Sequence, residues 1–260
     1  MARLMAASGA RMVVGLDAGL AVEEAARRSR EIPGLFWVQG DILRPPFRLG
    51  AFNRVISLGV LHHTMEPDRG FRAISDLVQD DGSLSVYVYH RDYYDWRQLN
   101  AALRVLGDAR RSLIGEPLRR LIVKLPESAR YAFCSALWER RRAIEHVRAQ
   151  PVVGRALARI LELSTPADVF KPLENRESNV ARSYDLYSTP YNYSHDLVEV
   201  IDWFERDGRY AELTVTPYRI SVTGFRGARG RNDALRIRYF ASKSSEEVEA
   251  SGIASAMTAD

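Results

Sequence analysis

Cysteine is almost absent from the sequence, since Cys134 is the only one among 260 residues. A single cysteine excludes an internal disulfide framework and is typical of a reducing compartment. Its context, YAFCSALW, is a helical pattern, so a buried thiol is the simpler interpretation and a reactive thiol the alternative. Long apolar runs and a signal peptide are also lacking. We therefore expect a cytoplasmic protein without a transmembrane segment.

Metal-ligand spacings and internal repeats are missing as well, with no CxxC or HxxxH pattern. A strong excess of one charge is absent, because 37 Lys and Arg stand against 33 Asp and Glu. The net charge of +4 gives little support to an anionic partner, so we expect neither a metal site nor nucleic acid as partner. The hydrophobic content of 46% is ordinary for one large domain or a domain with an insert.

Short apolar runs alternate with helical patterns through the first ninety residues. This order predicts βαβ units, and hence parallel strands that are covered on both faces. In such sheets, ligands bind beyond the carboxyl ends of the strands. The predicted strands are 12–16, 35–38, 52–58 and 84–89, and the helices between them include 21–30 and one that starts at Pro67 and carries Phe71, Ile74 and Leu77 on one face.

The middle of the chain has a different composition. Residues 91–180 are rich in Arg, Leu and Trp at helical spacing and are interrupted by prolines, which predicts a helical insert or cap. We assign residues 1–90 and 181–241 to one α/β domain that ends with an antiparallel strand pair, and we expect a disordered tail at 242–260. The basic runs RRLIVK and ERRRAIEHVR in the insert are either solvated helix faces or a phosphate- or lipid-binding surface.

Three predicted strand ends bring acidic or small residues to one edge of the sheet. Asp17 follows VVGL, Asp41 follows WVQG, and Ser57 follows RVI. A carboxylate can accept both hydroxyls of a ribose because it has two oxygens, and a second carboxylate one strand away can accept from a purine amino group. Strand-end aspartates also cap the following helix, so capping is the alternative for each of them.

Five segments together resemble successive motifs of a known family: GLDAG, VQGDI, LRPPF, FNRVISLGVLHHT and DDGSLSVYVY. They resemble the class I S-adenosylmethionine-dependent methyltransferases, in the small-molecule, type 11-like branch. The likeness covers about residues 5–90 and resumes at about 184–226. It implies a doubly wound, Rossmann-like α/β sheet and methyl transfer from S-adenosylmethionine to a small molecule.

The resemblance also implies a cofactor site built from the three strand ends. It assigns Asp17 to the ribose hydroxyls and Asp41 to the adenine amino group, and it places residues 57–59 beside the methionine part. The cofactor-binding residues that it predicts are Asp17, Ala18, Gly19, Asp41, Ile42, Ser57, Leu58 and Gly59.

His62 and His63 follow at the expected mouth of this site. Adjacent residues on a loop rarely chelate one ion together, so we favour a catalytic role. An imidazole near the methyl donor can take a proton from a phenol, hydroxyl or amine, whereas a hydrogen bond to the loop backbone is the alternative. A substrate lid, or alternatively aromatic packing of the insert onto the sheet domain, is predicted from Tyr184, Tyr187, Tyr191 and His195.

The family's glycine-rich loop is absent. It precedes the strand-end acidic residue by about 20 residues, which from Asp17 falls before Met1. We therefore expect the first strand of the family's sheet to be missing, the coding frame to extend upstream, and the 260-residue chain to bind cofactor poorly. The alternatives are a catalytically silent methyltransferase-like binding protein or a truncated product, and, more remotely, a nicotinamide-dependent oxidoreductase.

Overall fold

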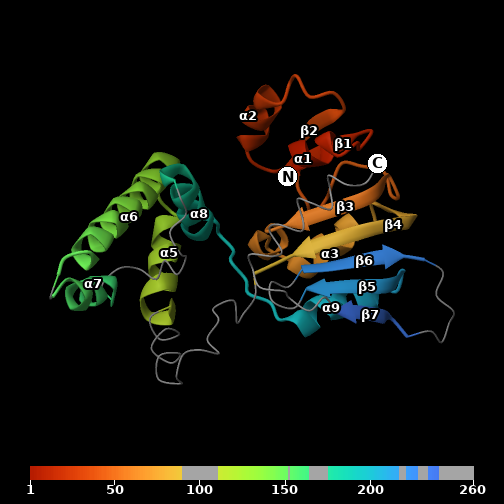
Figure 1. Ribbon diagram of the computed structural model, residues 1–260. Coiled ribbons are helices and arrows are strands. Elements are labelled where there is room, and N and C mark those ends of the chain that lie inside the picture. The colour runs from red at the N-terminus through yellow and green to blue at the C-terminus, as the bar shows by residue number, and fades with distance from the viewer. Residues whose placement is uncertain (90–110, 152, 164–174, 217–220, 228–233, 240–260) are drawn as a thin grey trace. The chain divides into compact units, whose positions relative to one another are not determined.

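Figure 1 shows the computed structural model of the chain, whose helices and strands form two units. One unit comprises Met1–Tyr93 and Tyr193–Asp260, and the other comprises Tyr94–Asn192. We call them the α/β unit and the helical unit. The structure describes residues 1–89, 111–151, 153–163, 175–216, 221–227 and 234–239.

The α/β unit begins with a small parallel sheet. After the short helix α1 (Ala2–Ala7), strand β1 (Val13–Asp17) pairs with β2 (Leu35–Gln39), and α2 (Ala21–Arg28) connects them. Trp37 lies over Gly15, where a Cβ would come within 2.4 Å of the indole ring. Glycine at this position therefore lets the indole lie flat against the neighbouring strand.

A second sheet of five strands follows, in the order β3-β4-β6-β5-β7. Strands β3 and β4 are parallel, as are β5 and β7, whereas β6 runs antiparallel to both β4 and β5. The parallel βαβ pairs and the late antiparallel pair confirm the expected α/β class. Both β1 and β3 are edge strands of their sheets. The strands of this sheet are Phe52–Leu58 (β3), Val78–Tyr87 (β4), Tyr210–Thr216 (β5), Ser221–Arg226 (β6) and Arg236–Tyr239 (β7).

Strand β4 begins earlier than the sequence pattern predicts. Asp81 and Gly82, a pair typical of turns, lie inside the strand, where the register against β3 shifts between Phe52 and Arg54. A Cβ on Gly82 would lie 2.6 Å from the carbonyl oxygen of Asn53. The Asp-Gly pair therefore forms an irregularity in the ladder that admits only a residue without a side chain.

Helices α3 (Pro67–Ser75) and α9 (Leu197–Asp207) pack on the same core of the larger sheet. Phe71 contacts Trp203 and Phe204, with ring centroids 5.7 Å and 4.8 Å apart. Pro67 begins α3, and Gly208, with φ of +74°, ends α9.

Helix α9 has an aspartate at its N-cap. Asp196 is the cap, because its side chain accepts a hydrogen bond of 2.8 Å from the Glu199 amide. The carboxylate thus satisfies one of the amides that the first helical turn leaves without a partner.

The helical unit has a core of its own, formed by Ile122, Cys134, Leu137, Val180 and Tyr187. Cys134 is fully buried there, which agrees with the simpler interpretation of this thiol. The elements described in this unit are the π-helix η3 (Arg111–Gly115), α5 (Glu116–Ile122), α6 (Glu127–Arg148), α7 (Gly154–Leu163) and α8 (Arg176–Ser188).

The boundary of the helical unit corrects our assignment of residues 181–192 to the α/β domain. They belong to the helical unit, because α8 contributes Val180 and Tyr187 to its core and packs against α6. The predicted tail at 242–260 lies outside the described residues. Among the described helices, none is both long and apolar enough to cross a membrane.

Candidate functional site

Asp17 lies at the carboxyl end of β1 in an exposed turn. Its Oδ1 accepts a 2.7 Å hydrogen bond from the Gly19 amide, while its carbonyl accepts one of 2.9 Å from Gly40. The Gln39 side chain donates to the carbonyl of Ala18 at 3.2 Å. These bonds hold the end of β1 beside the end of β2, and they leave the second carboxylate oxygen of Asp17 outside the turn.

Asp41 follows β2 in a similar turn, with Oδ1 accepting a 2.8 Å hydrogen bond from the Leu43 amide. Ile42 packs against the core of the larger sheet. Leu43 lies beside Gly70, where a Cβ would be 3.4 Å from its Cδ2 and 2.9 Å from that of Leu61. The loop that carries Asp41 therefore reaches α3 and the turn that follows β3. Each aspartate thus uses its Oδ1 to hold its own turn, and its second carboxylate oxygen takes no part in that hydrogen bond.

The third strand end has a different character. Ser57 is 4% exposed, and its hydroxyl has no hydrogen-bond partner among the described residues. Gly59 has φ of +75° and donates its amide to the Tyr87 carbonyl at 2.9 Å. A Cβ on Gly59 would meet no atom of the other described residues within 4 Å, so among these residues the space in front of this backbone is open. Leu58, between them, is 39% exposed.

His62 lies in the 3-10 turn η1 (Leu61–His63) and is fully buried, which differs from the expected open mouth. Its ring stacks on Tyr89 with centroids 3.9 Å apart and contacts His63 at 4.1 Å. The backbone of the segment before α9 closes over this stack. Tyr193 donates its amide to the His62 carbonyl, and His195 donates its amide to the Tyr89 carbonyl, each at 2.9 Å.

The four residues expected to form a lid are divided between the units. Tyr187 is 2% exposed and meets Phe133 edge-on at 5.4 Å, and the Arg130 guanidinium lies 5.9 Å from the Tyr184 ring. These tyrosines of α8 thus pack within the helical unit, and Tyr191 follows them in the same unit.

His195, by contrast, is buried in the α/β unit, where its Nδ1 lies 2.9 Å from Glu199 Oε1 and its ring meets Trp203 at 5.0 Å. No group of three or more His, Cys, Asp or Glu side chains is placed to hold a metal ion within the described part of the chain.

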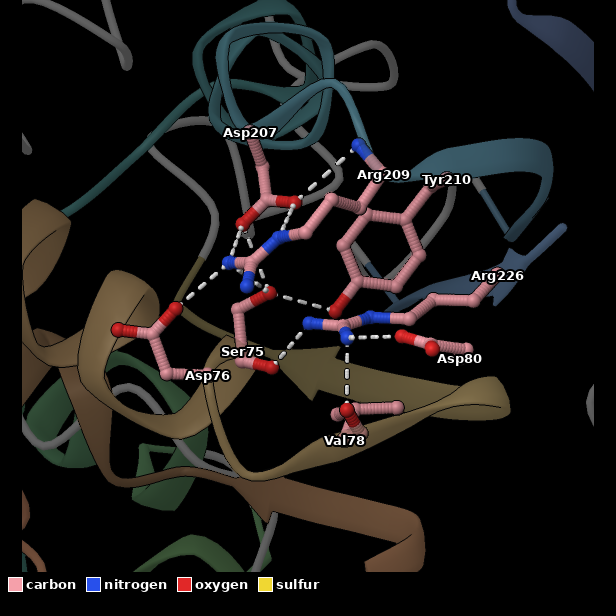
Figure 2. A network of polar contacts seen from close by, with 8 residues as sticks. All are labelled: Ser75, Asp76, Val78, Asp80, Asp207, Arg209, Tyr210 and Arg226. Carbon is pink, nitrogen blue, oxygen red and sulfur yellow. Dashed lines mark hydrogen bonds and ion pairs between the residues drawn. The ribbon is translucent and has the colours of Figure 1, made fainter. Parts of the chain in front are cut away.

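Sequence reasoning missed a buried polar network at the other end of the larger sheet (Figure 2). Ser75 Oγ lies 2.7 Å from the Tyr210 hydroxyl and donates to Asp207 Oδ2 at 2.8 Å. Arg209 pairs with Asp207 at 2.6 Å and with Asp76 at 2.8 Å. The only sequence signal is the order Asp-Gly-Arg-Tyr at 207–210, which does not reveal that Ser75 completes the network.

Arg226, at the end of β6, completes the same network. It donates to the carbonyls of Val78 and Ser75 at 2.6 and 2.5 Å, and its guanidinium lies 5.6 Å from the Tyr210 ring (Figure 2). Burial raises the pKa of Tyr210 above its ordinary value. The network joins the ends of α3, α9 and β6 to the starts of β4 and β5, so it stabilises the edge opposite to Gly59 and His62.

Residues 1–86 match the protein family described as "Methyltransferase domain". This segment belongs to the class I S-adenosylmethionine-dependent methyltransferases. The match confirms the family that the motifs indicated, and S-adenosylmethionine is the cofactor that such a domain implies. The matched segment contains Asp17, Asp41, Gly59 and both histidines of η1.

Several solved structures are similar to parts of the chain. The [4+2]-cyclase SpnF is 25% identical, with 32% of each chain covered and a TM-score of 0.31. An S-adenosylmethionine-dependent methyltransferase from Mesorhizobium loti is 22% identical, over 31% of this chain and 38% of that one, with a TM-score of 0.29. YcgJ from Bacillus subtilis is 16% identical over 84% of each chain, with a TM-score of 0.33.

The chain spans about a third of SpnF and 22% of the next similar structure, a methyltransferase domain of the citrinin polyketide synthase. No curated protein matches the chain.

Proposed function

We propose that the protein transfers a methyl group from S-adenosylmethionine to a small molecule in the cytoplasm. The observation that carries the proposal is the methyltransferase match of residues 1–86, which includes both strand-end aspartates. S-adenosylmethionine supplies an electrophilic methyl group, and the tasks left to the chain are binding, orientation and removal of a proton from the acceptor.

The described residues fit the adenosine part of such a cofactor. Asp17 and Gln39 are partners in the parallel register of β1 and β2, and Asp41 follows two residues later. Neighbouring strands are about 4.8 Å apart, so the two carboxylates can reach different parts of one nucleoside. The free oxygen of Asp17 is the proposed acceptor for the ribose hydroxyls, and that of Asp41 is the proposed acceptor for the adenine amino group.

The end of β3 is the proposed site of the reacting part of the cofactor. The open space before Gly59 allows a ligand to approach the backbone, and His63 lies half-buried in the next turn. We propose that His62 and His63 act together, with His62 held in the aromatic stack and His63 taking up the acceptor's proton where the acceptor carries one.

The test of this function is binding followed by transfer. Calorimetry on the purified chain should give weak but saturable binding of S-adenosylmethionine and of S-adenosylhomocysteine, and no binding of NAD or NADP in either redox state. Transfer of a labelled methyl group to a small-molecule extract would then show activity. A folded chain that binds neither sulfur compound refutes the function, and binding without transfer to any acceptor favours the catalytically silent alternative.

The helical unit is proposed to govern the choice of acceptor and not the affinity for cofactor. In the sequence, it interrupts the α/β unit between Tyr93 and Tyr193, soon after β4 ends at Tyr87. Replacing residues 94–192 by a short flexible linker should leave the affinity for S-adenosylhomocysteine within a few-fold. The linker variant must retain the circular dichroism of an α/β fold. In a variant that meets this condition, a loss of affinity of about 100-fold or more would contradict the assignment.

A further inference from the structure

Helix α7 buries two of its small residues and leaves Leu157 and Ile160, together with Val153 just before it, exposed. Gly154 and Ala158 are buried, and a Cβ on Gly154 would lie 2.3 Å from the carbonyl oxygen of Val147 on α6. Val153, Leu157 and Ile160 are 64%, 46% and 62% exposed. An amphipathic helix of a soluble domain normally does the opposite, because burial of large apolar side chains is what stabilises its packing.

The three exposed side chains share one side of the helix, because their spacing is i, i+4 and i+7. Val153 continues the helix, since its carbonyl accepts a 3.0 Å hydrogen bond from the Leu157 amide. We call Val153, Leu157 and Ile160 the α7 strip. Arg155 and Arg159 are exposed as well and, two residues after Val153 and Leu157, lie on another side of the helix.

A second set of exposed apolar residues lies near α5 of the same unit. Ile114, Leu121 and Leu125 are 48%, 60% and 37% exposed, at spacings of seven and four residues. Arg120 and Lys124 are exposed beside them. The basic run RRLIVK thus exposes a leucine between two cations, Arg120 and Lys124.

Charge is distributed unevenly between the two units. Residues 94–192 contain 17 Lys and Arg against 11 Asp and Glu, whereas the rest of the chain contains 20 against 22. The unit with the exposed apolar strips is thus the cationic one. Apolar side chains combined with Arg and Lys on one helix are the features that attach helices to the surface of anionic bilayers without crossing them.

We propose that the helical unit binds the surface of a bilayer that contains anionic lipids, with the α7 strip inserted among the acyl chains and the arginines at the headgroups. A nucleic acid fits less well, because phosphates pair with Arg and Lys but provide no apolar surface for Val153, Leu157 and Ile160. A second copy also fits less well, since two units of the same net positive charge repel each other. The proposal does not depend on methyl transfer.

The experiment is sedimentation of the purified full chain with vesicles of phosphatidylcholine alone and of phosphatidylcholine mixed with phosphatidylglycerol. Binding is expected to the mixed vesicles only and should weaken as salt is added. L157S/I160S should weaken that binding by about tenfold or more, because two large apolar side chains no longer insert. R155Q/R159Q should weaken it by about 30-fold, from roughly a factor of five for each cation near the surface.

The control is Val198→Ser, which removes an apolar side chain that is 75% exposed on α9 of the other unit and should leave vesicle binding unchanged. Circular dichroism must show that each variant is folded. Absence of binding to the mixed vesicles overturns the proposal, as does full binding by folded L157S/I160S. Self-association that L157S/I160S abolishes, without vesicle binding, would assign the strip to a second copy, and binding of duplex DNA without vesicle binding would assign the cations to nucleic acid.

Discussion

Replacing Asp207 by asparagine should lower the free energy of unfolding by about 2–4 kcal/mol. The Asp207 side chain is 1% exposed and accepts hydrogen bonds from Arg209 and from Ser75. Asparagine has the same shape but no charge and one acceptor fewer, so at least one buried donor loses its partner. The loss is not larger because Arg209 is 41% exposed and keeps its ion pair with Asp76. Urea unfolding of both chains measures the difference.

The matched control is Asp202→Asn on the same helix. Asp202 pairs with Arg206 at 2.7 Å, but the two side chains are 50% and 53% exposed. An exposed pair of this kind contributes about 0.2–1 kcal/mol, because water solvates both charges when the pair is broken. Equal losses for D207N and D202N would mean that the network in Figure 2 adds no more stability than a surface ion pair.

The same carboxylate should make the protein sensitive to acid. Burial by itself raises the pKa of Asp207, but hydrogen bonds from Arg209 and Ser75 outweigh it and hold the pKa below its ordinary value. A lowered pKa in the folded state means that the stabilisation is present above the unfolded value, about 3.9, and is lost as pH falls through the folded one. Unfolding free energy measured from pH 6 down to acid should therefore fall more steeply in the wild type than in D207N.

The order of elements could be predicted from the sequence because each depends on a local pattern. The strand that ends at Asp17, the helix that begins at Pro67 and the antiparallel pair β5–β6 each show the expected periodicity and turn residues. The predictions differ from the structure where a contact between residues far apart in the sequence determines the arrangement. Residues 181–192 join the helical unit because α8 packs on α6, and no feature of their own composition indicates that partner.

The candidate site, too, could be predicted from the sequence only in part. The strand-end positions of Asp17, Asp41 and Ser57 follow from the sequence, because a strand delivers its last residue to the edge of its sheet. The burial of His62 does not follow, since it depends on Tyr89 and on the segment before α9 that closes over the stack. The polar network around Ser75 could not be predicted from the sequence either, because Ser75 and Tyr210 are 135 residues apart in the sequence.

The affinity for S-adenosylhomocysteine should fall by about 100-fold or more in Asp17→Ala and by about tenfold or more in Asp41→Ala. In the proposed function, Asp17 accepts two charge-assisted hydrogen bonds from the ribose and Asp41 accepts one from the adenine, at about 1.5–3 kcal/mol each. Calorimetry on the wild type and the two variants measures the difference. Equal or reversed losses would contradict the assignment of Asp17 to the ribose.

Alanine at either position also removes the hydrogen bond that holds the local turn. The experiment therefore needs a variant that separates ligand binding from stabilisation of the turn. Each aspartate accepts a hydrogen bond from a backbone amide two residues ahead, Gly19 for Asp17 and Leu43 for Asp41. Asp17→Asn keeps one oxygen for that bond but presents an amide, which is a donor and carries no charge, where the ribose hydroxyls need an acceptor. If ligand binding is the role of Asp17, D17N should lose nearly as much affinity as D17A. If D17N binds like the wild type while D17A does not, the carboxylate acts only by holding the turn at the end of β1.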